Sequence, residues 1–195
     1  MFLVSEPFDQ QFKLLSDEDP RGTLFLLSDI GLDEDVEIEV IDRELNMPTR
    51  RIDHAYLVKR QGQAEIHHFE ATTRYALVDL DKMLDYGSLL DLKYRLPIYT
   101  RIVVLLERGM PKQIPQRYER RSGGHVRSMD LQIIKPLEIP ARKALVAGHP
   151  ALLPWVTLLA TSEAEQEEAL RRLAATRNRD LALRMALLAG LRYGN

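Results

Sequence analysis

The chain contains no cysteine among its 195 residues. This absence excludes a disulfide framework, a thiolate metal site and a cysteine nucleophile, and it fits a reducing compartment. The sequence also lacks the run of about 20 apolar residues that a membrane-spanning helix needs. Its start, MFLVSEPFDQ, carries too short an apolar run for a signal peptide. We therefore expect a cytoplasmic protein without a membrane partner.

Neither sign of charge dominates, since 27 Lys and Arg residues stand against 29 Asp and Glu residues and give a net charge of −2. Strong nonspecific binding to nucleic acid is therefore not expected, although a local basic patch can still bind phosphate. Hydrophobic residues make up 45% of the chain and charged residues 29%, so the chain can bury a core. Its length fits one domain with appendages.

The most informative stretch covers residues 50–74 and predicts a β-hairpin with one acid on each arm. β-branched and aromatic residues are common in both arms, and residues 60–63, with the sequence RQGQ, predict the turn. Because side chains alternate along a strand, Glu70 and Thr72 share one face, and antiparallel pairing brings Asp53 beside them. We expect the two carboxylates to converge at one edge of the sheet, at a point that suits a hard cation.

Apolar spacing along the rest of the chain predicts a definite order of helices and strands. The leucines of residues 77–96 recur at helical spacing with aspartates between them, so we expect a helix across the sheet with its aspartates outward. The strand that follows is almost entirely apolar, so we expect it in the middle of the sheet. The predicted elements are two short helices within 7–27, a half-buried strand at 36–40, the hairpin, a helix at 77–96, a central strand at 98–106, a loop at 109–124, a strand at 126–134 and a helical tail at 141–195.

This order and the acids of the hairpin resemble the PD-(D/E)XK nuclease superfamily, in particular its branch of transposase-like, recombination-promoting nucleases (Rpn). The resemblance implies an α/β (α+β) fold with a restriction-endonuclease-like αβββαβ core, a mixed sheet flanked by helices, over residues 1–140. Residues 141–195 would be a helical extension that packs on this core or mediates association. The landmarks that carry the resemblance occur in the usual order of the branch: Phe8-Asp9, Phe12-Lys13, Asp42-Arg43-Glu44-Leu45, Arg51-Ile52-Asp53, His68-Phe69-Glu70-Ala71-Thr72-Thr73-Arg74, Asp85-Tyr86 and Leu96-Pro97-Ile98-Tyr99.

The resemblance implies a metal-dependent endonuclease that hydrolyses phosphodiester bonds in DNA. By position, Asp53 and Glu70 match the two metal-binding acids of the superfamily, and Glu44 matches a further acid of some members. Magnesium keeps several waters, so one or two carboxylates and a substrate phosphate suffice to bind it, and manganese is an alternative. Thr72 departs from the pattern, because the superfamily has lysine there and this branch often glutamine. A hydroxyl cannot supply the positive charge of lysine, so we expect weakened or manganese-favoured activity.

Two alternatives remain open. The acids can serve the fold alone, with Asp53 paired to a neighbouring arginine and Glu70 paired to Arg74. The chain can also be a non-catalytic relative that keeps the fold to bind DNA or a protein, and a homodimer is a further expected form of association. If the chain binds DNA, we expect arginines to contact the phosphate backbone: Arg50, Arg51, Arg74, Arg117, Arg120 and Arg121.

The adjacent histidines His67 and His68 do not form a shared metal site in this prediction. Neighbouring residues of a strand point to opposite faces, so they cannot easily bind one ion together. We expect His68 as a partly buried, neutral side chain, with a supporting place beside Glu70 as the alternative.

Overall fold

The structure is a computed structural model that describes residues 5–41, 54–73, 77–106 and 115–193. These residues fall into two compact units. The helical unit comprises Met1–Glu34 and Lys135–Asn195, and the sheet unit comprises Asp35–Ile134. The first helices of the chain thus belong to the same unit as the C-terminal helices, while the domain division at residue 140 stays a prediction.

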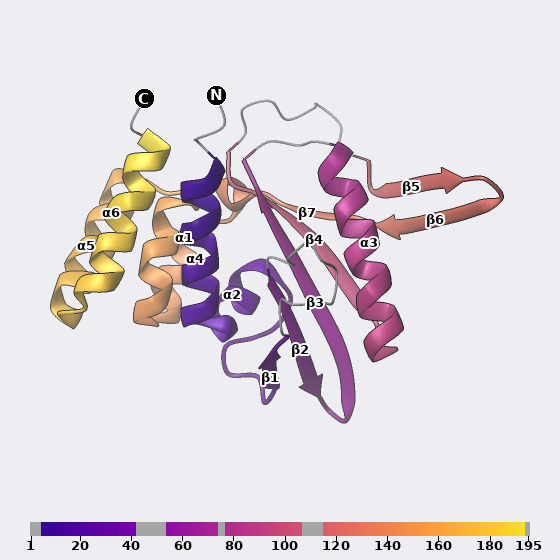
Figure 1. Cartoon of the computed structure of the whole chain (residues 1–195). Helices are drawn as coiled ribbons and strands as arrows, with labels where there is room; N and C mark the ends of the chain where they lie inside the picture. Colours follow the sequence, from indigo (N-terminus) through magenta and orange to yellow (C-terminus); the bar gives the residue numbers. More distant parts are fainter. Residues whose placement is uncertain (1–4, 42–53, 74–76, 107–114, 194–195) are drawn as a thin grey trace. The chain divides into compact units, whose positions relative to one another are not determined.

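The sheet unit contains one mixed sheet of five strands: β1 (Glu37–Val40), β2 (His54–Arg60), β3 (Gln63–Thr72), β4 (Ile98–Val104) and β7 (Gln132–Ile134). Their order across the sheet is β1-β2-β3-β4-β7 (Figure 1). The first three strands pair antiparallel, and β4 is parallel to both of its neighbours. The mixed α/β class expected from the sequence is therefore confirmed.

Strands β2 and β3 form the predicted hairpin. The turn residues Gln61 and Gly62 have φ angles of 49° and 78°. Two positive φ angles in a two-residue loop are typical of a type I′ turn, whose twist matches that of the strands it joins. Ala55 lies opposite His68. Because opposed residues of an antiparallel pair point to the same side, Ala55, His68 and Glu70 share one face of the sheet.

Helix α3 (Leu77–Tyr94) packs on the face that carries His68 and Glu70. Full burial of one large apolar side chain contributes about 1.5–3 kcal/mol, so this contact is a main source of stability for the unit. The helix ends two residues earlier than expected, and Arg95 follows it with a φ of 55°, in the left-handed conformation that commonly terminates helices. The helix and the sheet bury two apolar clusters, formed by Ile41, Ala55, Ile66, Tyr86 and Leu90, and by Leu80, Met83, Ile102, Val104 and Leu131.

Strand β4 occupies the internal position expected for residues 98–106. It lies between β3 and β7, and its residues from Thr100 to Val104 are buried. The strand predicted at 36–40 is only partly right. The observed strand, β1, begins at Glu37 and is an edge strand in which Val40 is 46% exposed, so it does not bury one whole face.

Residues 115–134 differ most from the sequence-based prediction. The expected loop contains β5 (Arg117–Ser122), which pairs antiparallel with β6 (His125–Asp130) in a separate two-stranded sheet. The single strand expected at 126–134 is therefore two strands, β6 and β7, which belong to different sheets. Both faces of the β5–β6 hairpin are largely polar, so the sequence lacks the alternation of apolar and polar residues that would have predicted these strands. The two-residue turn Gly123-Gly124, with Gly123 at φ +58°, was the available signal.

The helical unit confirms the two short helices near the start of the chain and the helical tail. The first two helices are separated at Asp19, whose side chain accepts a hydrogen bond from the Gly22 amide and caps the second helix. Trp155 is fully buried and meets the edge of Phe12 with ring centroids 5.7 Å apart. The elements are α1 (Ser5–Glu18), α2 (Pro20–Leu27), η1 (Pro136–Glu138), α4 (Arg142–Ala147), η2 (Pro150–Thr157), α5 (Glu163–Thr176) and α6 (Arg179–Tyr193).

The start of α5 yields a stability prediction. Ser162 Oγ accepts a hydrogen bond from the Glu165 amide at 3.3 Å, and Glu165 Oε2 accepts one from the Ser162 amide at 2.9 Å. We expect Ser162→Ala to lower the free energy of unfolding by about 1 kcal/mol. Urea unfolding at neutral pH measures this, with Thr161→Ala as the control; an equal loss in both variants would contradict the capping role.

The same contacts make this loss depend on pH. The hydrogen bond from the Ser162 amide, and then that from its hydroxyl, lowers the pKa of Glu165 in the folded protein. A carboxyl with a depressed pKa stabilises the fold above its unfolded pKa, and this contribution disappears as the pH falls through the folded pKa. The difference between the wild type and Ser162→Ala should therefore shrink in acid.

Candidate functional site

Glu70 and Thr72 lie at the carboxyl end of β3, on the face covered by α3. Glu70 is aligned with Ile102 and Thr72 with Val104 of the parallel strand β4. The Glu70 side chain is 19% exposed. In open sheets with parallel strands, ligands commonly bind beyond the carboxyl ends of the strands. The two described members of the predicted catalytic set thus share the face that their spacing predicts.

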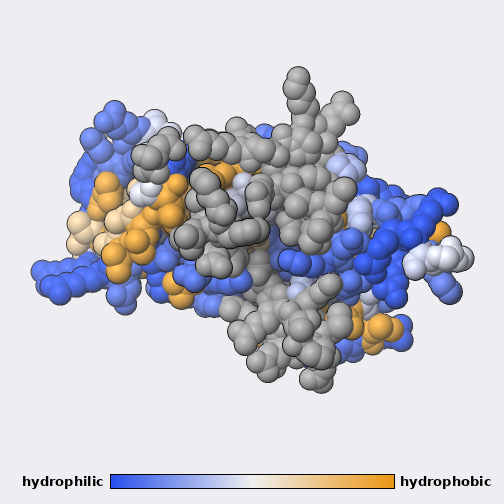
Figure 2. All heavy atoms as spheres, turned by 45° about the horizontal axis from the view of Figure 1, so that its top comes forward, coloured by the Kyte–Doolittle hydropathy of each residue, from blue (hydrophilic) through white to orange (hydrophobic). Residues whose placement is uncertain are grey.

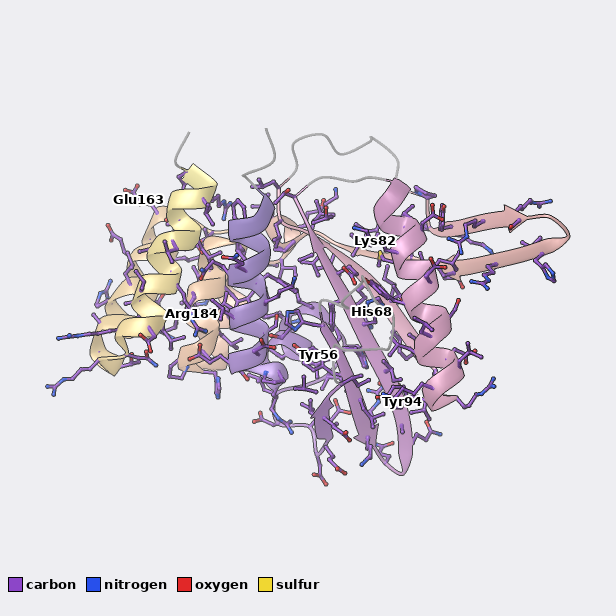
Figure 3. All side chains as sticks on the ribbon, in the orientation of Figure 1. Tyr56, His68, Lys82, Tyr94, Glu163 and Arg184 are labelled. Carbon is purple, nitrogen blue, oxygen red and sulfur yellow. The ribbon has the colours of Figure 1, made fainter. Side chains whose placement is uncertain are left out.

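His68 supports Glu70 from the same strand. Its Nε2 lies 3.2 Å from Glu70 Oε1, and its ring meets Tyr86 of α3 edge-on, with centroids 6.1 Å apart. His68 lies on the α3 side of β3 (Figure 3) and is fully buried, more deeply than expected. The alternative place beside Glu70 is therefore the observed one. The contact with His68 restrains one carboxylate oxygen of Glu70.

The other predicted acids, Asp53 and Glu44, lie outside the described residues, as do the predicted DNA-binding residues Arg50, Arg51 and Arg74. The convergence of Asp53 with Glu70 therefore stays a prediction. Strand β2 begins at His54, the residue directly after Asp53 in the chain. Within the described ranges, no three His, Asp or Glu side chains are grouped so that they could hold a metal ion.

A second polar cluster occupies the opposite face of the sheet, where His67 points away from His68 as predicted. Arg101 NH1 lies 2.6 Å from His67 Nδ1, and His67 Nε2 lies 2.9 Å from Glu65 Oε1. Because a guanidinium only donates hydrogen bonds, Nδ1 must accept, and Nε2 carries the proton that it donates to Glu65. The geometry thus assigns a neutral His67 with its hydrogen on Nε2.

Arg101 was missed from the sequence, although one signal was present. It is the one charged residue in the apolar run IYTRIVVLL. Its side chain is 5% exposed, and its guanidinium lies over the rings of Phe69 and Tyr99 at 5.6 and 5.5 Å. Burying a charge is costly unless it is paired. We therefore interpret the contacts of Arg101 as structural, because they hold the strands of the sheet together.

The β5–β6 hairpin is attached to α3 by an ionic cluster. Arg120 reaches Asp85 at 2.6 Å and Asp81 at 3.1 Å, while Arg127 lies 3.5 Å from Asp85. Tyr118 donates a hydrogen bond to Asp81 at 2.9 Å. The hydrogen bond to Asp85 is the main cause that raises the pKa of Arg120. Two of the aspartates that were expected to face solvent, Asp81 and Asp85, therefore hold the hairpin, whereas Asp91 is exposed as expected. One predicted DNA-binding arginine, Arg120, is already paired within the chain.

The other arginines of the hairpin are more accessible. The side chains of Arg117 and Arg121 are 63% and 76% exposed, and their partners, Asp130 and Glu119, lie on the hairpin itself. Such exposed ion pairs contribute little and exchange readily with other charges. Near the tip, a hollow of about 550 Å³ is lined by Arg120, Arg121, Ser122, His125, Val126 and Arg127.

No protein-family model, curated protein or solved structure matches this chain. The geometry of its own residues therefore carries the functional argument. Among the helices that the structure describes, none is long and apolar enough to cross a membrane.

Asp85 offers a direct test of how the hairpin is held. We expect Asp85→Asn to weaken the attachment by about 1 kcal/mol, since hydrogen bonds to charged groups are worth somewhat more than neutral ones. Backbone amides of Arg117–Ser122 and His125–Asp130 should then exchange hydrogen about five times faster. Asp91→Asn, an exposed position of the same helix, is the matched control. Unchanged exchange in Asp85→Asn would show that the apolar contacts hold the hairpin alone.

Proposed function

We propose that the chain is a metal-dependent DNA endonuclease of the PD-(D/E)XK type, close to the transposase-like, recombination-promoting branch. The order of its elements supports this: two helices, three antiparallel strands, a helix, and a strand parallel to the third. The observation that carries the proposal is the position of Glu70. It lies at the carboxyl end of β3, partly exposed, on the face that also carries Thr72.

The described residues fit a magnesium or manganese site in part. Glu70 supplies one hard oxygen ligand, and the proposal assigns Asp53, with Glu44, as the others. A divalent ion bound there would lower the pKa of a water molecule and offset negative charge on the phosphate. His68 would act as a positioning residue, because its hydrogen bond restrains the carboxylate of Glu70 at 3.2 Å.

DNA would be held mainly through phosphate contacts from arginines. Within the described residues, Arg117 and Arg121 are the best candidates, because their partners are exposed carboxylates that a phosphate can replace. Arg120 is a weaker candidate, since leaving Asp81 and Asp85 would detach the hairpin. Binding should therefore fall steeply with salt while the hairpin remains attached.

A second candidate function is a non-catalytic binding module with the same fold. Thr72 favours it, since the position that would stabilise charge in the superfamily holds a neutral hydroxyl. The Glu70–His68 contact also gives the acid a structural role that needs no metal. Under this reading the partner is DNA or a protein. A homodimer remains part of either proposal.

Cleavage of supercoiled plasmid with magnesium or manganese separates the two functions. The endonuclease requires cleavage that depends on the ion and on both Asp53 and Glu70. Retained DNA binding without cleavage in every variant would favour the binding module. If the well-folded protein neither cleaves nor binds DNA, both the endonuclease and the DNA-binding module are contradicted.

A further inference from the structure

Helix α6 is apolar on two opposite sides. Leu181, Met185 and Leu188 are buried on the inner side. On the outer side, Leu183 and Leu187 are 61% and 45% exposed. A surface helix normally presents charged or polar residues to solvent, and a helix that is apolar all round is normally covered all round. The outer side of α6 therefore has the composition of an interface.

The outer side has a regular pattern, which we name the α6 stripe: Ala182, Leu183, Ala186, Leu187 and Gly190. All five residues are exposed. Residues four apart lie on the same side of a helix, so the small residues form one row and the leucines another beside it. Small residues let a second helix approach closely, and leucines supply apolar area. The stripe contains no charged residue.

Helix α1 widens this surface. Arg184 of α6 donates a hydrogen bond to the Leu14 carbonyl at 3.1 Å and pairs with Glu18. These contacts keep the two helices side by side, and the Leu14 side chain is 44% exposed. Arg184, at the edge of the stripe, is labelled in Figure 3. Figure 2 shows hydrophobic residues gathered at the left, over the helical unit.

We propose that the α6 stripe is the interface of a homodimer in which two α6 helices pack antiparallel about a two-fold axis at Ala186. Arg179 and Tyr193 stand at equal sequence distances on either side of Ala186. The antiparallel arrangement places the exposed Arg179 against the ring of Tyr193 of the partner subunit at both ends, as a cation–π contact. A parallel arrangement would place two Arg179 side chains together and would be repulsive.

The rows of the stripe also complement each other in this arrangement. The two-fold axis at Ala186 brings Ala182 opposite Gly190 of the partner subunit. Leu183 lies one residue from this position, where the missing side chain of the glycine leaves room for the leucine. The small residues let the helix axes approach to the short end of the usual 8–10 Å range. One helix pair with Leu14 added covers less than the roughly 800 Å² per subunit of a standard interface. We therefore expect a dissociation constant on the order of 10 μM.

Sedimentation equilibrium of the full chain over a micromolar concentration series tests the proposal. The wild type should shift from monomer to dimer, and Leu183→Glu should weaken dimerisation at least about 30-fold, as for a central interface residue. Leu92→Glu is the matched control, because Leu92 is also a helical leucine with 61% of its side chain exposed. A wild type that stays monomeric throughout, or a dimer that Leu183→Glu leaves intact, would overturn the proposal.

Cysteine cross-linking tests the geometry without disturbing the apolar surface, and the absence of native cysteine makes it specific. Ala186→Cys should form a dimer-linking disulfide under mild oxidation, since the two positions meet at the axis. Ala164→Cys, an exposed position of α5, should not. A mixture of Ala182→Cys and Gly190→Cys proteins should cross-link to each other, whereas Ala182→Cys alone should not. Cross-linking of Ala182→Cys with itself would indicate a parallel dimer and overturn the antiparallel one.

Discussion

Thr72→Lys is expected to raise the rate of metal-dependent plasmid cleavage by about 10²–10³-fold, whereas Asp53→Ala and Glu70→Ala abolish it. In the proposed endonuclease Asp53 and Glu70 would supply the oxygen ligands, so the change at Thr72 would spare metal binding and affect the chemical step. A lysine ammonium at this position adds a positive charge where negative charge develops on the phosphate. One preorganised donor in such a place is typically worth about 2.7–4 kcal/mol.

The measurement is single-turnover cleavage of supercoiled plasmid by the wild type and the variants under magnesium and under manganese. Glu70→Gln is a sharper control than Glu70→Ala, because the amide oxygen can still accept a hydrogen bond from His68 while the charge is lost. Glu70→Gln should therefore keep the stability of the wild type and lose cleavage. Cleavage that survives the loss of both acids would place the activity elsewhere.

A basic residue from another part of the chain is the main competitor for the role of the missing lysine. Arg74 follows Thr72 closely in the sequence but lies outside the described residues. Lys82 comes from α3, the helix that covers this face of the sheet (Figure 3). If Lys82 already supplies the charge, Thr72→Lys gains nothing and Lys82→Gln loses the activity. Measuring both substitutions decides which residue acts on the phosphate.

The parts of the fold that follow a regular apolar pattern could be predicted. The β2–β3 hairpin was recognised because its side chains alternate and RQGQ supplies a glycine, the residue that adopts a positive φ most readily. The face shared by His68, Glu70 and Thr72 follows from the same period of two. Helix α3 and the internal strand β4 were predicted because their leucine spacing and continuous apolar run are local properties of the sequence.

The parts held by contacts distant in sequence could not be predicted in this way. Strands β5 and β6 are polar on both faces, and they are attached through Arg120 to Asp85 of α3, 35 residues earlier in the chain. No local feature of either segment predicts that Arg120 pairs with Asp85. The aspartates of α3 are spaced as on a solvent-exposed helix face. The same spacing also lets them pair with arginines of a hairpin, so the pattern does not distinguish the two. Arg101 is similar, because only its partner His67 explains a charge inside an apolar strand.

Gly22→Ala is expected to destabilise the helical unit by about 2 kcal/mol, although alanine normally favours a helix over glycine by about 1 kcal/mol. A Cβ at this position would lie 2.2 Å from Asp19 Oδ2 and 2.5 Å from Leu152 Cδ2. The Asp19 side chain cannot move away from the added Cβ without losing its own contacts. Its Oδ1 accepts the hydrogen bond from the Gly22 amide at 2.9 Å, and its Oδ2 lies 2.9 Å from His149 Nδ1.

The expected loss is thus a clash combined with a damaged helix cap, whose replacement typically costs about 1 kcal/mol. Urea unfolding of the full chain measures it, with Gly31→Ala as the matched control, because the atom nearest to a Cβ at Gly31 is Glu34 Cβ at an ordinary 3.6 Å. A double-mutant cycle identifies the cause. In an Asp19→Ala background the carboxylate is gone, so Gly22→Ala should cost less than in the wild type. Equal costs in the two backgrounds would assign the strain to Leu152 instead, and no cost in either would mean that α2 does not approach η2 this closely.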